Sequence, residues 1–192
     1  MGSRLDSLEK SSLFRLTAFF ADASVASQVG QSGIKWFHKP TKTMFRGRYQ
    51  HTIDPKGRLS VPARFRDALA QLGEQSDQLV VVPNEHALEV HPLVEWQRIE
   101  EKLNAQPMFT PEVRQLSRLY MSRAKDVSVD NVGRVLLPPD TRKEAGLDKE
   151  VTLVGGGRRM FEVWDRARFE EYERTHGDSL PSLFDKLSGY GV

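Results

Sequence analysis

Residues 54–66 read DPKGRLSVPARFR, which is typical of a tight turn, a short strand and the start of a helix. The Asp54 side chain can hydrogen-bond its own backbone two residues on, and Gly57 supplies the positive φ that such a turn needs. Apolar and polar residues then alternate, so one face of the strand is apolar and Arg58 lies on the other. Because Pro62 has no N–H to donate to a sheet, the strand should end there.

The same pattern recurs in residues 130–142, which read DNVGRVLLPPDTR. Five residues repeat at one constant spacing, as the pairs Asp54/Asp130, Gly57/Gly133, Arg58/Arg134, Pro62/Pro138 and Arg66/Arg142. A single Asp-x-x-Gly-Arg sequence is common in surface hairpins, but this set of matches indicates an internal duplication. Each copy should contain a hairpin, a short helix, a second hairpin and a longer helix. In copy one, residues 45–53 and 58–61 are predicted to pair as the first hairpin.

Local signals place the helices of the first copy. Residues 63–72 have the spacing of an amphipathic helix, and Gly73 should end it. Pro92 is predicted to open a longer helix at its first position. Thr110 followed by Pro111 is typical of a further helix start, with the threonine as N-cap.

The second copy contains three consecutive glycines, Gly155, Gly156 and Gly157, which are predicted to form the turn of a hairpin over residues 151–163. The alternative is a phosphate-binding loop. The sequence lacks the Gly-x-x-x-x-Gly-Lys-Ser/Thr spacing, and no long helix follows directly, so the turn is favoured. Asp165 is expected to cap the helix after the hairpin.

The composition limits the kinds of protein that this chain can be. Of its 192 residues, 39% are hydrophobic, which is enough for one or two small cores. The absence of cysteine excludes a disulfide framework and thiolate chemistry, and it fits a reducing compartment. No apolar run reaches about 20 residues, the length of a membrane-spanning helix, so no membrane partner is expected.

Basic residues are concentrated in the first copy. The net charge is only +2, from 28 basic and 26 acidic residues, so a nucleic-acid site would have to be a local patch. The span 46–66 contains a single acid, Asp54. Its basic residues are Arg46, Arg48, Lys56, Arg58, Arg64 and Arg66. The matching span 122–142 mixes basic residues with aspartates, so the first copy is expected to face DNA.

Residues 1–43 differ from the rest of the chain. Their apolar patch at 13–20 is short and interrupted by Arg15, which disfavours a secretory signal. A disordered leader is the favoured interpretation. Because the patterned sequence begins just after Met44, that methionine is an alternative natural start.

No arrangement typical of catalysis or metal binding is found in the sequence. His86 and His91 have glutamates nearby, but there is no His-Glu-x-x-His or Cys/His pattern. Ser60, Ser117 and Ser122 lack the context of a nucleophile elbow. We therefore expect no metal, no cofactor, no small-molecule substrate and no enzymatic activity.

Arg58 allows two interpretations. In the first, Asp54 and Arg58 face each other across the turn as a structural ion pair, which would contribute little to stability. In the second, Asp54 holds the guanidinium so that its remaining donors meet a phosphate or a guanine edge. The basic neighbours of Arg58 favour the second interpretation. The mixed charge around Arg134 slightly favours a structural pair with Asp130.

At these residues the chain resembles the MraZ family of bacterial transcriptional regulators, of the SpoVT/AbrB-type DNA-binding superfamily. The likeness runs from Met44 to about Tyr172. The segments that carry it read MFRG at 44–47, DPKGRLSVP at 54–62, LVEW at 93–96, DNVGR at 130–134 and EVWD at 162–165. The paired Asp-x-x-x-Arg signature is specific to this group. The family usually begins at the residue that matches Met44.

The resemblance implies an α+β fold in which two tandem SpoVT/AbrB-like swapped-hairpin elements form a pseudo-dimeric β-barrel with flanking helices. It also implies a division of the chain. The expected parts are the leader 1–43, a first repeat 44–91, linking helices 92–123, a second repeat 124–167, and a C-terminal helix and tail 168–192.

The resemblance further implies a cytoplasmic, nucleoid-associated regulator, usually a repressor. It would form a ring-shaped homo-oligomer and bind direct repeats in double-stranded DNA, upstream of the division and cell-wall gene cluster that includes its own gene. The candidate DNA-binding residues are Arg46, Arg48, Lys56, Arg58 and Arg134. The turn and signature residues are Asp54, Gly57, Asp130 and Gly133.

A rival class is an antitoxin-like protein-interaction module, because antitoxins share this barrel and use a tail to hold a toxin. The short C-terminal tail of this sequence disfavours that class. An enzyme is the weakest candidate, because no site for it is found.

Overall fold

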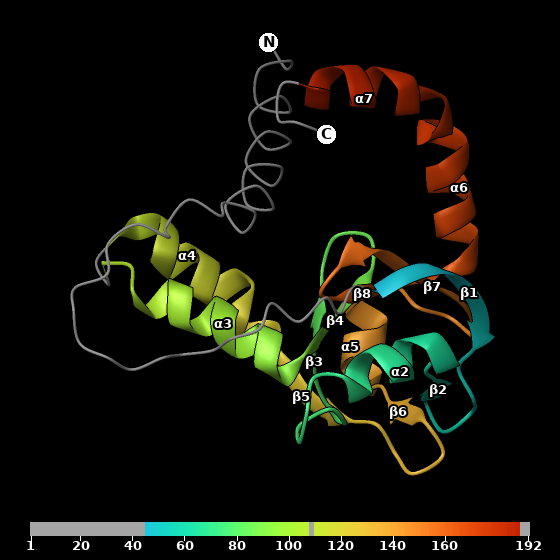
Figure 1. Cartoon of the computed structure of the whole chain (residues 1–192), viewed down its shortest axis with the longest axis horizontal. Coiled ribbons are helices and arrows are strands. Elements are labelled where there is room, and N and C mark those ends of the chain that lie inside the picture. Colours follow the sequence, from blue (N-terminus) through green and yellow to red (C-terminus); the bar gives the residue numbers. More distant parts are fainter. Residues whose placement is uncertain (1–44, 108–109, 189–192) are drawn as a thin grey trace. The chain divides into compact units, whose positions relative to one another are not determined.

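The computed structural model describes residues 45–107 and 110–188, and it confirms a mixed α+β fold (Figure 1). Its strands are β1 (Phe45–Thr52), β2 (Arg58–Ser60), β3 (Gln78–Pro83), β4 (Leu88–Pro92), β5 (Lys125–Ser128), β6 (Arg134–Leu136), β7 (Glu150–Arg158) and β8 (Phe161–Asp165). Its α-helices are α2 (Ala63–Ala70), α3 (Leu93–Asn104), α4 (Pro111–Leu119), α5 (Pro139–Glu144), α6 (Arg166–His176) and α7 (Leu180–Leu187). The leader, residues 1–43, for which disorder is predicted, lies outside the described residues.

The strands form a six-stranded antiparallel sheet, in the order β1-β7-β8-β4-β3-β5, and a two-stranded antiparallel sheet of β2 and β6. Most of these pairings join one copy to the other. Strands β1 and β2 belong to copy one, and their partners β7 and β6 belong to copy two. Strand β5 of copy two pairs with β3 of copy one. Each copy therefore completes its sheets with strands of the other, and we call this arrangement interlocked.

The strand register shows the sequence duplication in three dimensions. At the centre of the two-stranded sheet, Leu59 lies opposite Val135, its equivalent in the second copy. In the larger sheet, Glu89 lies opposite Glu162, which is again its equivalent. Two copies related in this way have a pseudo-two-fold axis that passes through both pairs.

The ladders do not close into a barrel. The six-stranded sheet has two edges, β1 and β5, and the two-stranded sheet stands apart from it. Only the isolated bridges Ile53–Leu59 and Val129–Val135 join the two sheets. The expected barrel is therefore wrong: the larger sheet is open, and the two-stranded sheet adjoins it. The barrel does not close because the two strands on either side of each turn pair mainly with strands of the other copy.

The first predicted hairpin is a turn without a ladder. Gly57 N–H donates to the Asp54 carbonyl at 2.8 Å, and Asp54 N–H donates to the Arg58 carbonyl at 2.9 Å, so the turn itself forms as predicted. Beyond the bridge from Ile53 to Leu59, however, β1 pairs with β7 and β2 with β6. The prediction that residues 45–53 pair along 58–61 is wrong.

The three glycines of copy two lie within a strand, so the predicted turn there is also wrong. Strand β7 continues through them to Arg158, and β8 starts at Phe161. A Cβ on Gly155 would lie 2.5 Å from the carbonyl carbon of Phe45 and 2.6 Å from the nitrogen of Arg46. Glycine is required at this position because the backbone of β1 approaches β7 closely.

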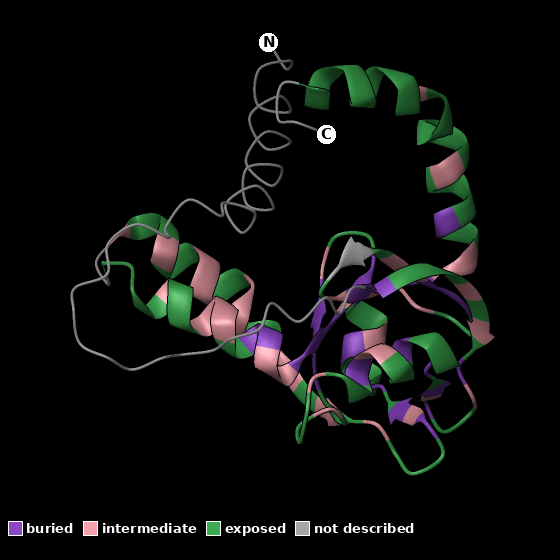
Figure 2. Ribbon diagram, in the orientation of Figure 1, coloured by how far each residue is buried: buried purple, intermediate pink, exposed green. Residues whose placement is uncertain are grey.

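The hydrophobic core joins the six-stranded sheet, α2 and the two-stranded sheet. The rings of Phe45 and Phe65 have centroids 5.2 Å apart, and those of Phe65 and Phe161 are 4.9 Å apart. Leu59 and Val135 are buried against the same cluster. Figure 2 shows buried residues concentrated in the strands. One face of the β2–β6 sheet is thus fixed to the core.

Most helices follow their predicted signals, but Pro92 is the last residue of β4 and caps α3, which begins at Leu93, so it does not occupy the predicted first helical position. Gly73 has φ of 98° shortly after α2, and the Asp165 carboxylate accepts a hydrogen bond from Arg168 N–H at 3.1 Å, so it caps α6. Helix α4 begins after Thr110 as predicted, but the threonine side chain makes no capping hydrogen bond. Helix α7 is exposed along its whole length (Figure 2). In the described part of the chain, no helix has the length and apolar character needed to cross a membrane.

Candidate nucleic-acid interface

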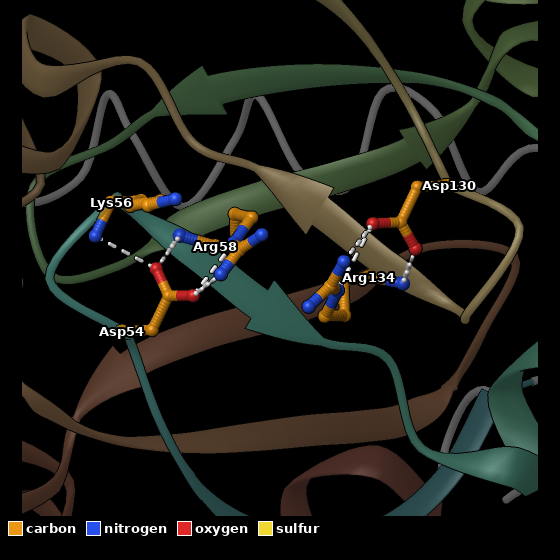
Figure 3. Close-up of polar contacts among 5 residues, drawn as sticks. All are labelled: Asp54, Lys56, Arg58, Asp130 and Arg134. Carbon is orange, nitrogen blue, oxygen red and sulfur yellow. Dashed lines mark hydrogen bonds and ion pairs between the residues drawn. The ribbon is translucent and has the colours of Figure 1, made fainter.

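The first turn is built around the Asp54 carboxylate (Figure 3). Its Oδ1 accepts hydrogen bonds from the backbone N–H groups of Lys56 and Arg58, both at 2.9 Å. Its Oδ2 accepts from Nε and Nη2 of Arg58, both at 2.6 Å. One aspartate therefore shapes the turn and orients the arginine. Nη1 of Arg58 has no hydrogen-bond partner among the described residues and can serve an external acceptor.

The second turn repeats this arrangement. Oδ1 of Asp130 accepts from the N–H groups of Val132 at 3.0 Å and Arg134 at 2.9 Å. Oδ2 accepts from Nε of Arg134 at 3.0 Å and from its Nη2 at 2.9 Å. We call each of these pairs, Asp54 with Arg58 and Asp130 with Arg134, an Asp–Arg clasp.

The clasps keep both aspartates charged to low pH. The side-chain hydrogen bond from Arg58, with backbone N–H donors, lowers the pKa of Asp54 from its ordinary value of 3.8 to about 2. Hydrogen bonds from the backbone N–H and then the side chain of Arg134 lower the pKa of Asp130. Each guanidinium therefore has an ionised partner that fixes its orientation at neutral pH.

Both clasps lie on one exposed face of the two-stranded sheet formed by β2 and β6, which we call the ribbon. Arg58 is opposite Leu136, and Ser60 is opposite Arg134. Residues opposite each other in an antiparallel ladder share a face, so these four side chains form the outer face of the ribbon. Figure 3 shows the two arginines between the two aspartates, in front of the ribbon strands. The structure thus brings Arg58 and Arg134 to one face, although the distribution of basic residues along the sequence predicts that copy one alone faces DNA.

Each turn is also approached by an arginine from the opposite copy. The side chain of Arg66, from α2, packs over Gly133, and that of Arg142, from α5, packs over Gly57. Nε of Arg142 also donates to the Leu137 carbonyl at 3.3 Å. Arg142 is absent from the candidates drawn from the sequence. The signal was its place in the repeat, since Arg66 and Arg142 recur at the same spacing as the clasps.

The other basic candidates lie in different surroundings. Lys56 is exposed at the tip of the first turn. Arg46 and Arg48 are exposed on β1, and four residues, or roughly 13 Å, separate Arg48 from the end of the strand at Thr52. Arg48 forms an ion pair with Glu173 of α6, and its guanidinium carbon lies 5.3 Å from the centre of the Phe169 ring. Arg48 is therefore directed toward α6.

The two histidines considered as metal ligands lie in separate environments. His91 is buried, with Nε2 3.1 Å from Oε2 of Glu89, which also accepts from the Tyr120 hydroxyl at 2.5 Å. His86 stacks on Trp164. Within residues 45–107 and 110–188, no group of three or more histidine, cysteine or acidic side chains is placed to hold a metal ion.

The fold and this face define a class of protein, in which two interlocked copies of one α+β unit present a shared ribbon with paired Asp–Arg clasps. Residues 44–119 and 120–186 each match a family model described as "MraZ protein, putative antitoxin-like". The chain therefore belongs to the MraZ family.

Relatives across much of the chain carry the same family name. A transcriptional regulator MraZ from Desulfitobacterium hafniense (strain Y51) is 43% identical over 149 residues, which cover 78% of this chain and 100% of the relative. A transcriptional regulator MraZ from Nitrosospira multiformis is 44% identical over 148 residues, which cover 76% of this chain and 99% of the relative. These matches confirm the family assignment made from the sequence motifs.

Proposed function

We propose that this chain is a DNA-binding transcriptional regulator, and not an enzyme, that acts through the outer face of the ribbon. The observation that carries the proposal is the pair of Asp–Arg clasps on that face. An arginine held by a carboxylate presents its remaining donors in a fixed geometry, which suits a guanine edge or a phosphate. A two-stranded ribbon fits the major groove. The names of the relatives support the regulatory role.

We expect some basic residues to contact bases and others to contact phosphates. Arg58 and Arg134, at the centre of the face, would contact base edges. Lys56, and Arg46 on β1, would contact phosphates, which contribute affinity and salt dependence without selecting a sequence. Arg48 would contribute only by exchanging its partner Glu173, so we rank it last among the candidates.

We also propose that the chain assembles into a ring-shaped homo-oligomer. One ribbon offers few base contacts, and identical ribbons on neighbouring subunits would gain by effective concentration. Two unlike exposed apolar features support self-assembly. One is the stripe on α7, and the other is the single residue Leu119 of α4, which is 56% exposed. The exposed residues of the α7 stripe, at helical spacing, are Leu180, Leu183, Phe184 and Leu187. Contacts between unlike faces of successive subunits are heterologous and can close a ring.

The biological setting of the proposal comes from the family. The ring would bind direct repeats upstream of the division and cell-wall gene cluster, including the chain's own gene, as a cytoplasmic, nucleoid-associated repressor. We propose that the interlocked copies, within 44–91 and 124–167, are swapped-hairpin elements of the SpoVT/AbrB type. The linking helices would then be 92–123, and the C-terminal helix and tail 168–192. The cross-copy pairings of β1, β2 and β5 support this assignment.

The test is fluorescence anisotropy of the protein on DNA from upstream of its own gene, at two salt concentrations, with scrambled DNA as reference. We expect specific binding that weakens steeply with salt. Replacing Arg58 with alanine should reduce specific affinity by about 5- to 150-fold, because a bidentate contact to a base is worth about 1–3 kcal/mol.

Arg174→Ala is the matched control, because Arg174 forms a bidentate pair with Glu171 on α6, away from the ribbon. It should bind as the unaltered protein does. Equal and weak binding by the unaltered protein and Arg58→Ala would refute the proposal. Loss of the assembly in gel filtration of Arg58→Ala would instead show that the clasp is structural.

The alternative function is an antitoxin-like protein-interaction module. The observation that favours it is the α7 stripe, which is unpartnered among the described residues and would suit an apolar groove on another protein. If the protein shows no preference for its upstream DNA and remains monomeric, the stripe would be assigned to such a partner.

A further inference from the structure

The outer face of the ribbon is symmetric in its arginines but not in its other two residues. Leu136 lies opposite Arg58, and Ser60 lies opposite Arg134. By the spacing of the repeat, Leu136 and Ser60 are equivalent positions, so copy two presents a leucine where copy one presents a serine. At the adjacent turns, Val132 of copy two replaces Lys56 of copy one.

Leu136 does not serve the core. The inward positions of the ribbon are occupied by Leu59 and Val135, which are at most 2% exposed, whereas Leu136 is 58% exposed. Single exposed leucines are common on protein surfaces and need no explanation by themselves. This one is directly opposite a clasped arginine on a face that we assign to DNA, where every position of the ribbon can meet a base.

The charge of the face indicates what covers Leu136. Asp54 and Asp130 balance the charges of Arg58 and Arg134. The excess positive charge beside the face comes from Lys56 at the first turn and from Arg66 and Arg142 over the two turn glycines, and it favours an anionic partner. A second ribbon packed on this face would bring like charges together, which disfavours a copy of this chain as the occupant. DNA offers an apolar group in its major groove, the C5-methyl group of thymine.

We propose that Leu136 is a specificity-determining residue that contacts a thymine methyl group in the major groove, next to the base or phosphate contacted by Arg58. The inference rests on the proposed DNA-binding function. Ser60 cannot make the same apolar contact at the equivalent position. The two strands of the ribbon therefore contact different bases, and one chain recognises a DNA sequence that is not palindromic.

The test compares two DNA duplexes from upstream of the chain's own gene by fluorescence anisotropy. In the second duplex, deoxyuridine replaces every thymidine, which removes the methyl groups and keeps the Watson–Crick pairing. We expect the unaltered protein to lose about three- to fivefold in affinity on the uracil duplex, the scale of one buried methyl group. Leu136→Ser should bind the thymine duplex more weakly by a similar factor and should lose its sensitivity to uracil.

Arg174→Ala provides the control, because Arg174 pairs with Glu171 on α6, away from the ribbon and from both proposed assembly contacts. It should keep the full uracil effect. The inference is overturned if the unaltered protein and Leu136→Ser lose equally on uracil DNA, or if the unaltered protein binds both duplexes equally. It is also overturned if Leu136→Ser keeps the full uracil effect and changes the oligomeric state in gel filtration. A protein that does not prefer its upstream DNA to scrambled DNA would instead refute the proposed function itself.

Discussion

The Asp–Arg clasp shows how one carboxylate can serve structure and recognition together. Asp54 accepts the backbone N–H groups that define the turn through one oxygen, and it orients Arg58 through the other. The two interpretations of Arg58 are therefore not exclusive. Nε and Nη2 of Arg58 donate to Asp54, and its third nitrogen, Nη1, remains available on the ribbon face.

The depressed pKa of Asp54 predicts how stability changes with pH. Because folding lowers the pKa from 3.8 to about 2, the ionised clasp stabilises the protein above about pH 4, and that contribution is lost as the pH falls toward 2. Asp54→Asn keeps the side-chain shape but removes the charge. Its free energy of unfolding, measured by urea denaturation from about pH 5 to pH 2, should fall less than that of the unaltered protein.

Asp130→Asn should reproduce this change, because the pKa of Asp130 is lowered by the equivalent hydrogen bonds. An identical dependence on pH in the unaltered protein and Asp54→Asn would contradict the assignment of the clasp.

At the scale of elements, the close approach between β1 and β7 constrains the sequence through backbone atoms that cannot move aside as a side chain can. Gly155→Ala should lower the free energy of unfolding by about 1–3 kcal/mol, because the new Cβ would meet the backbone of Phe45 and Arg46 rather than a movable side chain. The adjacent Gly156→Ala is the control, since a Cβ there has nothing within 4 Å. Equal unfolding midpoints for the two variants in urea would show that β1 can shift away from β7 freely.

Helix caps provide a second prediction at this scale. Asp165→Ala should lower stability by about 0.5–2 kcal/mol, because it removes the side-chain acceptor for Arg168 N–H at the start of α6. Thr110→Ala should have a smaller effect, since the Thr110 side chain makes no capping hydrogen bond to α4. Thermal or urea unfolding measures both; a larger loss at Thr110 would reverse the assignment of the caps.

Local chemistry could predict some elements and not others. The turn at Asp54, the glycine after α2 and the Asp165 cap each depend on residues within a few positions, and the sequence predicts them. The role of Gly155 depends on β1, which lies far away in sequence. Without the pairing of β1 with β7, three consecutive glycines resemble a turn. Arg142 was missed for the same reason, because it contacts a glycine of the other copy.

At the scale of the whole molecule, the two copies should fold only together. A fragment of residues 44–119 contains β1 and β2 but lacks β7 and β6, their ladder partners. As a monomer it is expected to lack a cooperative thermal transition in circular dichroism, and adding residues 120–188 should restore one. A cooperative transition in the monomeric fragment alone would show that the copies are independent domains.

The interlocked pairing also means that β1 is synthesised well before its partner strand β7. Translation at about 5–20 residues per second needs roughly 5–20 s to cover the approximately 100 residues between Thr52, where β1 ends, and Glu150, where β7 begins. During that time β1 carries unpaired backbone groups that another nascent chain could match. Neighbouring ribosomes on one message would expose equivalent strands at close range. The topology therefore makes exchange of β1 between newly made chains a specific hazard of synthesis.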